Sequence, residues 1–232
     1  MVINFMKNKQ SKIRGFTLIE LLVVIAVIGI LMGMVGPKVF DLLTSSKVKK
    51  SQAVFRSWVT QLHQYKEFYK YFPPFLLEED EGKPLLLSDD INHESFIIAL
   101  KGMKWEPDMS EWQPLEQGNE LRDQNRKGRE FHSFSEDEFG PDGYLADSWG
   151  GTKIRVLVDQ DGDGLIKLDS AAVDEIISAL KQDNDPEIVD AAKEKISVIR
   201  EKVGIYVLYD ESGETESENV FSWDIGKYLV ED

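Results

Sequence analysis

Residues 12–37 of the chain read KIRGFTLIELLVVIAVIGILMGMVGP. A basic segment ends at Gly15, and an apolar run then reaches from Phe16 to Gly36 with Glu20 as its one charge. At about 1.5 Å per residue, a helix over this run is about 30 Å long, the thickness of a bilayer core. Because a carboxylate is costly in hydrocarbon, Glu20 is expected to have a functional partner.

The hexapeptide Gly15-Phe16-Thr17-Leu18-Ile19-Glu20 follows a basic leader and opens the apolar run. It resembles the prepilin processing signal of type IV pilins and type II secretion pseudopilins. The resemblance implies that a prepilin peptidase cleaves after Gly15 and that the new amino-terminal Phe16 is N-methylated. It also implies that Glu20 pairs with the amino-terminal charge of a neighbouring subunit, either a copy of the chain or another pseudopilin, in a filament.

The flanks of the run predict its topology. Lys7, Lys9, Lys12 and Arg14 precede it, so a cytoplasmic amino terminus, a single pass through the inner membrane and a periplasmic or extracellular carboxy-terminal domain are expected. No small-x-small cleavage site follows the run, which disfavours an ordinary secretory signal. Pro37 removes a backbone donor at the end of the span. In the family such a proline marks a segment that unwinds on assembly, and a plain membrane-exit kink is the alternative.

An amphipathic helix is predicted to continue the span, because apolar side chains recur every three or four residues until Pro73-Pro74. The stripe comprises Val48, Ser51, Phe55, Trp58, Leu62, Tyr65, Tyr69 and Phe72. We therefore expect an α+β, pilin-like fold, in which a long amino-terminal helix packs on a small antiparallel sheet. The expected parts are a leader (1–15), a transmembrane and assembly helix (16–37), its amphipathic continuation (38–72) and an exported globular domain (73–232).

Within the globular domain the patterns are shorter. A helix capped by Asn92 and ended by Gly102 is predicted, then a long loop over 103–128. Strands are predicted at 129–135, 152–158, 204–210 and 219–223, with an insertion of two helices over 170–202, the first capped by Ser170. Asp147-Ser148-Trp149-Gly150-Gly151 partly resembles the D-P-W-G-N-P-Y motif of pseudopilins, and like that motif it precedes a strand.

One segment carries ligand chemistry. Asp159, Asp161 and Asp163 alternate with Gln160 and two glycines, so their carboxylates can converge on a calcium ion when the chain turns, with the Leu165 carbonyl as a further ligand. At the twelfth position Ser170 replaces the bidentate Glu of an EF-hand, and Asp169 beside it is the candidate substitute. A strand rather than a helix precedes the loop, so it is not an EF-hand. An acidic turn without a metal is the alternative.

Composition narrows the function. The net charge of -15 disfavours nucleic acid as a partner, and the absence of cysteine means that no disulfide can close a loop. His63, His93 and His132 are scattered, and no catalytic motif accompanies them, so enzymatic activity is not expected. The sequence predicts a structural subunit of a type II secretion or type IV pilus-like filament. The alternative is a monomeric, membrane-anchored calcium- or ligand-binding module that does not polymerise.

Overall fold

The computed structural model describes residues 17–106, 111–208 and 218–230, and within these the side chains at 34–37, 40, 41 and 106 are not described. The chain divides into two units, Met1–Ser45 and Ser46–Asp232. Helix α1 (Leu18–Tyr69) contributes to both units. The fold is α+β, as predicted, and is consistent with a pilin-like fold.

The first unit consists, in its described part, of the beginning of α1. Its apolar side chains are exposed; Leu18 is 88% and Met32 69% accessible. Among the described residues, no helix combines the length and the apolar character needed to cross a membrane. The span predicted for 16–36 therefore stays a prediction.

The second unit begins within α1 and buries the predicted stripe. Phe55, Trp58, Leu62 and Tyr65 are fully inaccessible, which confirms that the aromatic residues of this helix belong to the core. The helix ends at Tyr69, three residues before the predicted end, and Lys70 follows with φ of 73°. The chain then enters a short 3-10 helix, η1 (Pro74–Leu77).

A four-stranded antiparallel sheet forms the centre of this unit, in the order β1-β4-β7-β8. Its strands are β1 (Leu85–Leu86), β4 (Arg155–Val158), β7 (Val203–Val207) and β8 (Val220–Phe221). The pairing of Val156 with Ile205 sets the register of β4 on β7. The strands predicted at 152–158, 204–210 and 219–223 are therefore present, but in the described residues they are shorter than predicted.

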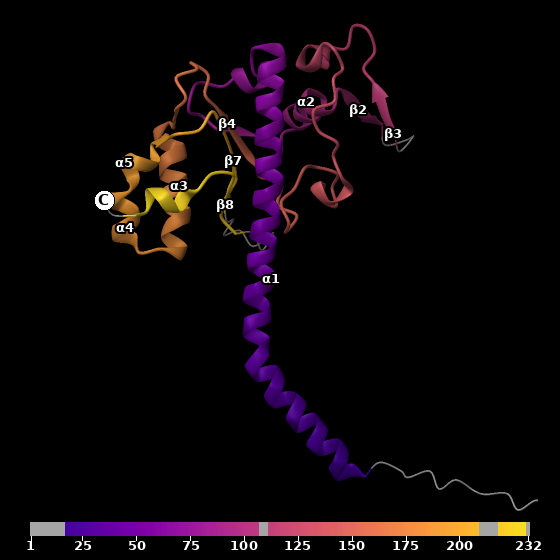
Figure 1. The fold of residues 1–232 in the computed structure, drawn as a ribbon, viewed down its shortest axis with the longest axis vertical. Helices are drawn as coiled ribbons and strands as arrows, with labels where there is room; N and C mark the ends of the chain where they lie inside the picture. The colour runs from indigo at the N-terminus through magenta and orange to yellow at the C-terminus, as the bar shows by residue number, and fades with distance from the viewer. Residues whose placement is uncertain (1–16, 107–110, 209–217, 231–232) are drawn as a thin grey trace, which may run out of the picture. The chain divides into compact units, whose positions relative to one another are not determined.

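Both faces of this sheet are covered (Figure 1). Val156 and Val158 share a core with the aromatic residues of α1. Leu157, which points to the opposite face, packs with α3 (Ser170–Asp183) in a second core. Strand β7 is buried at every position for the same reason, so the predicted insertion forms a second covering layer.

The insertion differs in detail from the prediction. Asp169, not Ser170, caps α3, because its carboxylate accepts a hydrogen bond from the Ala172 amide at 2.7 Å. In place of one second helix there are two short ones, α4 (Pro186–Ala191) and α5 (Lys193–Ile196). The chain then forms β6 (Val198–Ile199), which pairs with β5 (Ile166–Lys167).

Three further predictions in the middle of the chain need correction. Helix α2 (Asp90–Lys101) is capped by Asp89 rather than Asn92, although Gly102 ends it in the left-handed region as expected. The expected loop over 103–128 contains a hairpin of β2 (Met103–Glu106) and β3 (Glu111–Pro114), followed by η2 (Glu120–Asn125).

Residues 129–135 do not form the predicted strand. Phe131 and His132 instead donate their backbone N–H groups to the Leu100 carbonyl at the end of α2. The chain continues into η3 (Glu136–Glu138), and near its carboxy terminus it forms η4 (Ile225–Tyr228).

Candidate functional site

The helix start in the signal region is held by a reciprocal pair of side chains. Glu20 Oε2 accepts hydrogen bonds from the Thr17 amide at 2.8 Å and from the Thr17 hydroxyl at 2.9 Å. The Thr17 hydroxyl oxygen accepts the Glu20 amide at 3.3 Å. A threonine followed three residues later by a glutamate that bonds back to it is a capping box. Thr17 of the same chain is therefore one partner of the Glu20 carboxylate, for which the sequence predicts a partner.

The structure describes only some of the remaining signal residues. Gly15 and Phe16 lie outside the described residues, so the predicted cleavage point stays a prediction. The helix α1 runs through position 37 without a break, and the side chain of Pro37 lies outside the described part.

The acidic loop between β4 and β5 brings three predicted ligands together. One carboxylate oxygen from each of Asp159, Asp161 and Asp163 lies within 4.8 Å of the others. Asp159 is buried, and its two oxygens accept the amides of Gly162 at 2.7 Å and Gly164 at 3.0 Å. These glycines have φ of 80° and 87°, a conformation that side chains with a Cβ adopt only at a cost.

A lysine already neutralises the outer half of the loop. Lys167 Nζ lies 3.1 Å from Asp161 Oδ2 and 2.6 Å from Asp163 Oδ2. These bonds raise the pKa of Lys167. The pKa of Asp161 is lowered, first by the hydrogen bond from the Asp163 amide and then by Lys167. The ammonium group thus acts as a stand-in cation, and the two carboxylates face a common cation position.

The other two predicted ligands have different surroundings. Asp169 caps α3 and is not among the three carboxylates that converge. The Leu165 amide donates to Asp163 Oδ1 at 2.8 Å, which tightens the turn. The structure therefore brings together three of the five predicted ligands and uses Asp169 as a helix cap. Asparagine and aspartate are common at helix caps, and this signal was present at Asp169 in the sequence.

The segment that resembles the pseudopilin motif ties the loop before β4 to α1. Asp147 Oδ1 accepts the amides of Trp149 and Gly151, both at 2.8 Å. Ser148 and Ser51 are joined by two hydrogen bonds of 2.9 Å, one from the Ser148 amide and one between the hydroxyls. Asp147 is buried, and its burial raises its pKa. The segment has a structural role in this fold.

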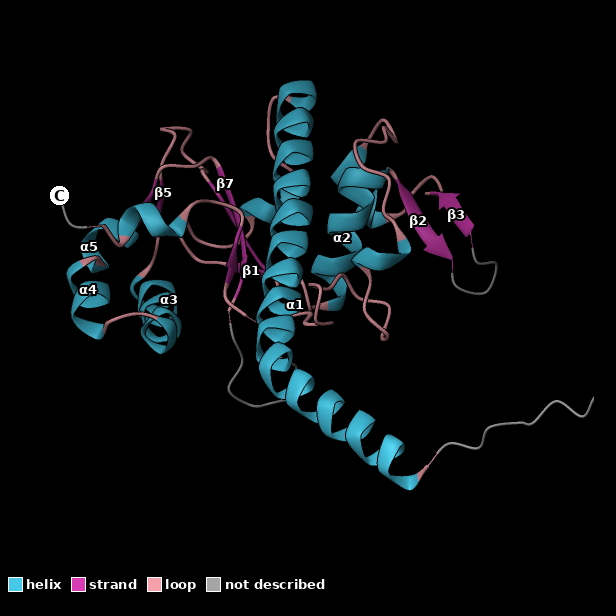
Figure 2. Ribbon diagram, turned by 60° about the horizontal axis from the view of Figure 1, so that its bottom comes forward, coloured by secondary structure: helices cyan, strands magenta, loops and turns pink. Residues whose placement is uncertain are grey.

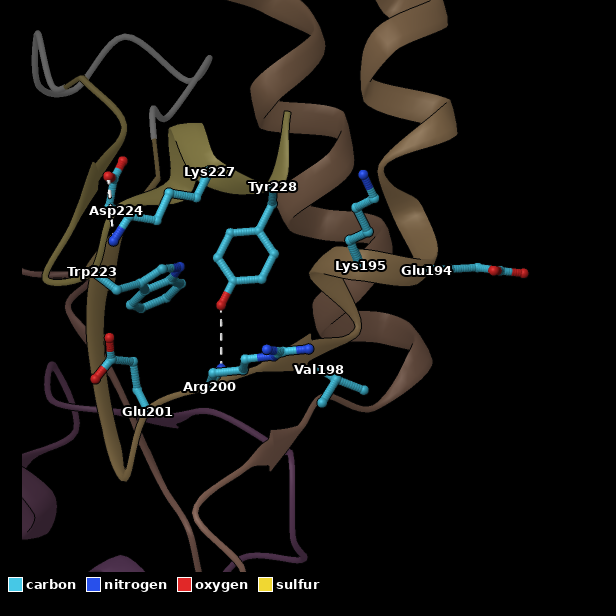
Figure 3. Close-up of a pocket in the computed structure, with 9 residues that line it drawn as sticks. All are labelled: Glu194, Lys195, Val198, Arg200, Glu201, Trp223, Asp224, Lys227 and Tyr228. Atoms are coloured by element: carbon cyan, nitrogen blue, oxygen red, sulfur yellow. Dashed lines mark hydrogen bonds and ion pairs between the residues drawn. The ribbon is translucent and has the colours of Figure 1, made fainter. Parts of the chain in front are cut away.

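A hollow that the sequence did not indicate lies beside α5 and η4 (Figure 3). Its volume is about 600 Å³, and the Tyr228 hydroxyl bridges it by accepting the Arg200 amide at 3.2 Å. The indole N–H of Trp223 is buried there with no partner among the described residues. The hollow is lined by equal numbers of basic and acidic side chains, so its charge favours neither an anionic nor a cationic ligand. The basic ones are Lys195, Arg200 and Lys227, and the acidic ones are Glu194, Glu201 and Asp224.

Comparison with known proteins identifies the amino-terminal segment. Residues 10–36 match the family model described as the prokaryotic N-terminal methylation motif. The chain therefore carries the signal of type IV pilins and pseudopilins. The match ends before the globular unit, and the likeness of residues 73–232 to pseudopilins is not confirmed by it. Searches of curated proteins and of solved structures each return no match to the chain.

The motif supports a type IV pilin-like or pseudopilin precursor. This class favours a structural subunit over an enzyme, and it implies processing by prepilin peptidase and assembly with pilin subunits.

Proposed function

We propose that this precursor is a pseudopilin-like subunit of a type II secretion or type IV pilus-like filament. The observation that carries the proposal is the methylation motif over residues 10–36, which includes Gly15, Phe16 and Glu20. Prepilin peptidase cleaves after Gly15, Phe16 becomes the methylated amino terminus, and the amino-terminal helix then packs against the helices of other subunits.

Glu20 supplies the assembly contact. Both hydrogen bonds from Thr17 end on Oε2, so among the described residues none occupies Oε1, which can accept a hydrogen bond from the charged amino group of a neighbouring Phe16. Cleavage after Gly15 keeps Thr17 and its amide in the mature chain, so the capping box survives processing. A charge-assisted hydrogen bond between subunits is favourable in an apolar environment, where an unpaired carboxylate is costly.

Before assembly, residues 16–36 anchor the subunit in the inner membrane with the leader in the cytoplasm and the globular unit exported. The apolar side chains of the first half of α1 are exposed, which supports the proposal that lipid or neighbouring helices surround this half. The second half of α1 buries its stripe in the core, which supports the proposal that this half holds the globular unit.

Calcium is proposed as the ligand of the acidic loop. Three oxygens within 4.8 Å fit a hard cation that takes oxygen ligands, and the Leu165 carbonyl is the candidate fourth. The ion would displace Lys167 from Asp161 and Asp163. Because the chain lacks cysteine, such an ion would be the available cross-link for this loop. Asp169 can join the ligand set only by giving up the amide of Ala172.

Substitution of Glu20 separates this proposal from a monomeric anchor. The full chain is expressed with a prepilin peptidase and a filament assembly system, and its amounts in the membrane and in sheared filaments are measured. We expect Glu20→Ala to stay in the membrane and to disappear from filaments. Thr17→Ala is the matched control, because it removes part of the capping box and keeps the carboxylate. Glu20→Ala at normal levels in filaments would refute the assembly role.

A further inference from the structure

A groove of about 740 Å³ lies between α2, the β2–β3 hairpin and the segment around η3. Figure 2 shows the hairpin beside α2, outside the four-stranded sheet. Aromatic rings form much of the wall of the groove and acidic side chains accompany them. The aromatic residues are Trp105, Trp112, Phe134, Phe139 and Tyr144, and the acidic ones are Asp90, Glu94, Glu136 and Asp142.

The two tryptophans give the groove a prepared aromatic surface. Trp105 and Trp112 face each other across the hairpin with ring centroids 5.2 Å apart at 63°. Trp112 also stacks on Phe134, which belongs to the core that α1 shares with the sheet. This contact holds the hairpin rings against the core. Trp105 nevertheless remains 41% exposed. A large exposed indole on a short hairpin adds little to the core and is typical of a contact surface.

One of these rings already attracts a cation. The Lys101 ammonium lies 5.4 Å from the centroid of the Trp112 ring, and its charge is paired with Glu130 at 2.7 Å. The negative face of an indole favours such an approach. Trp105 offers the same chemistry with more of its surface open to solvent.

The charges around the groove are unbalanced. Lys104 is the one lysine or arginine among the described lining residues, and it is paired with Glu94 at 3.2 Å. His93 accepts the Leu145 amide through Nε2 at 3.0 Å, and burial lowers its pKa, so the ring is neutral at pH 7. Apart from Glu94, which is paired with Lys104, the acidic side chains of the lining are Asp90, Glu136 and Asp142. They make the groove electronegative.

We propose that this groove docks an arginine side chain presented by a segment of a partner polypeptide. A guanidinium group is planar, stacks on aromatic faces and bonds carboxylates, so it matches an exposed indole beside acidic side chains better than an ammonium group does. Ile97 and Phe139 add apolar surface for the residues that flank the arginine. The groove lies in the globular unit and does not depend on the filament role of α1.

The experiment measures binding of a fluorescein-labelled peptide, Gly-Leu-Arg-Leu-Gly with blocked ends, to the full chain in detergent. A second peptide carries citrulline, the neutral isostere of arginine, at the central position. We expect the arginine peptide to bind at least about tenfold more tightly, in line with a desolvated cation–π contact. Equal affinity for the two peptides would overturn the proposal.

Variants of the chain test the location. Trp105→Ala is expected to weaken the arginine peptide about tenfold and Trp105→Phe much less, because a ring remains. Glu136→Gln is expected to weaken it by a smaller factor that shrinks at high salt. Glu187→Gln, on α4, is the matched control and is expected to change nothing. Equal losses in Glu136→Gln and Glu187→Gln would show nonspecific attraction to an acidic surface and overturn the proposal, as would free arginine binding as tightly as the peptide.

Discussion

The indole Nε1 of Trp58 donates a 2.6 Å hydrogen bond to Oε2 of Glu138, and this bond joins α1 to η3 within the core. The same oxygen lies 2.8 Å from His132 Nε2, and Oε1 accepts the Ser135 amide at 2.9 Å. Trp58 is fully buried and Glu138 is 5% exposed. This polar contact in the apolar stripe of α1 thus helps to fix the position of the helix against the loop segment.

Removing the charge of Glu138 should destabilise the globular unit. Glu138→Gln keeps the size of the side chain and weakens several charge-assisted bonds, so we expect a loss of about 2–3 kcal/mol in unfolding free energy. Urea unfolding followed by near-UV circular dichroism measures it. Glu136→Gln, two residues earlier and exposed, is the control and should change stability by less than about 0.5 kcal/mol. Equal effects of the two substitutions would contradict the role of Glu138.

The same carboxylate should make stability depend on acid. Burial raises the pKa of Glu138, but hydrogen bonds from His132, Ser135 and Trp58 outweigh it and hold the pKa below the ordinary value of 4.5. The unfolded chain therefore binds this proton more readily, and stability falls as the pH falls from about 5 towards 3. The fall should be shallower in Glu138→Gln. Parallel pH profiles for the two proteins would rule out this carboxylate as the source.

Long patterns were predictable from the sequence, and contacts between distant segments were not. The stripe through Phe55 and Trp58 shows its helical period locally, and Gly102 is a recognisable helix end. The hairpin around Trp105 and Trp112 was missed, because four-residue strands with few alternating positions give little periodic signal. Asp89 was missed as a cap since several capping residues stand together in that segment.

The site was predictable to a similar extent. The spacing of Asp159, Asp161 and Asp163 indicated their convergence, which the structure shows. The role of Lys167 does not follow from the sequence, although this residue lies four residues after Asp163 on the next strand. Its role depends on how β5 leaves the turn, which a local pattern does not encode. Ser135 and His132 lie close to Glu138 in the sequence, but its third partner, Trp58, comes from α1, and no sequence pattern brings Trp58 to it.

Calcium binding should respond in opposite directions to two substitutions in the acidic loop. Asp161→Asn removes a ligand charge and is expected to weaken Ca²⁺ binding, whereas Lys167→Met removes the competing ammonium and is expected to strengthen it. Isothermal titration of the full chain in detergent measures both. Absence of binding in the natural chain and in Lys167→Met would contradict the calcium proposal. The loop would then be interpreted as an acidic turn without a metal.

Two glycines with similar backbone angles should differ in their tolerance of alanine. Gly82 has φ of 80° and Gly118 φ of 97°, so both substitutions strain the backbone by about 1–2 kcal/mol. A Cβ on Gly82 would also lie 1.8 Å from the Lys167 carbonyl oxygen, whereas the space around Gly118 is open. We expect Gly82→Ala to cost clearly more in urea unfolding. Equal costs would mean that the approach of this loop to β5 is not as described.

Processing of the amino terminus tests most directly whether the chain is a prepilin-type precursor. The full chain is produced together with a prepilin peptidase, and its amino terminus is read by mass spectrometry, with Gly15→Val as the uncleaved control. We expect a chain that begins at Phe16 and carries one added methyl group on its amino nitrogen. A natural chain that keeps Met1–Gly15 in the presence of an active peptidase, or that is cut at another position, would contradict it.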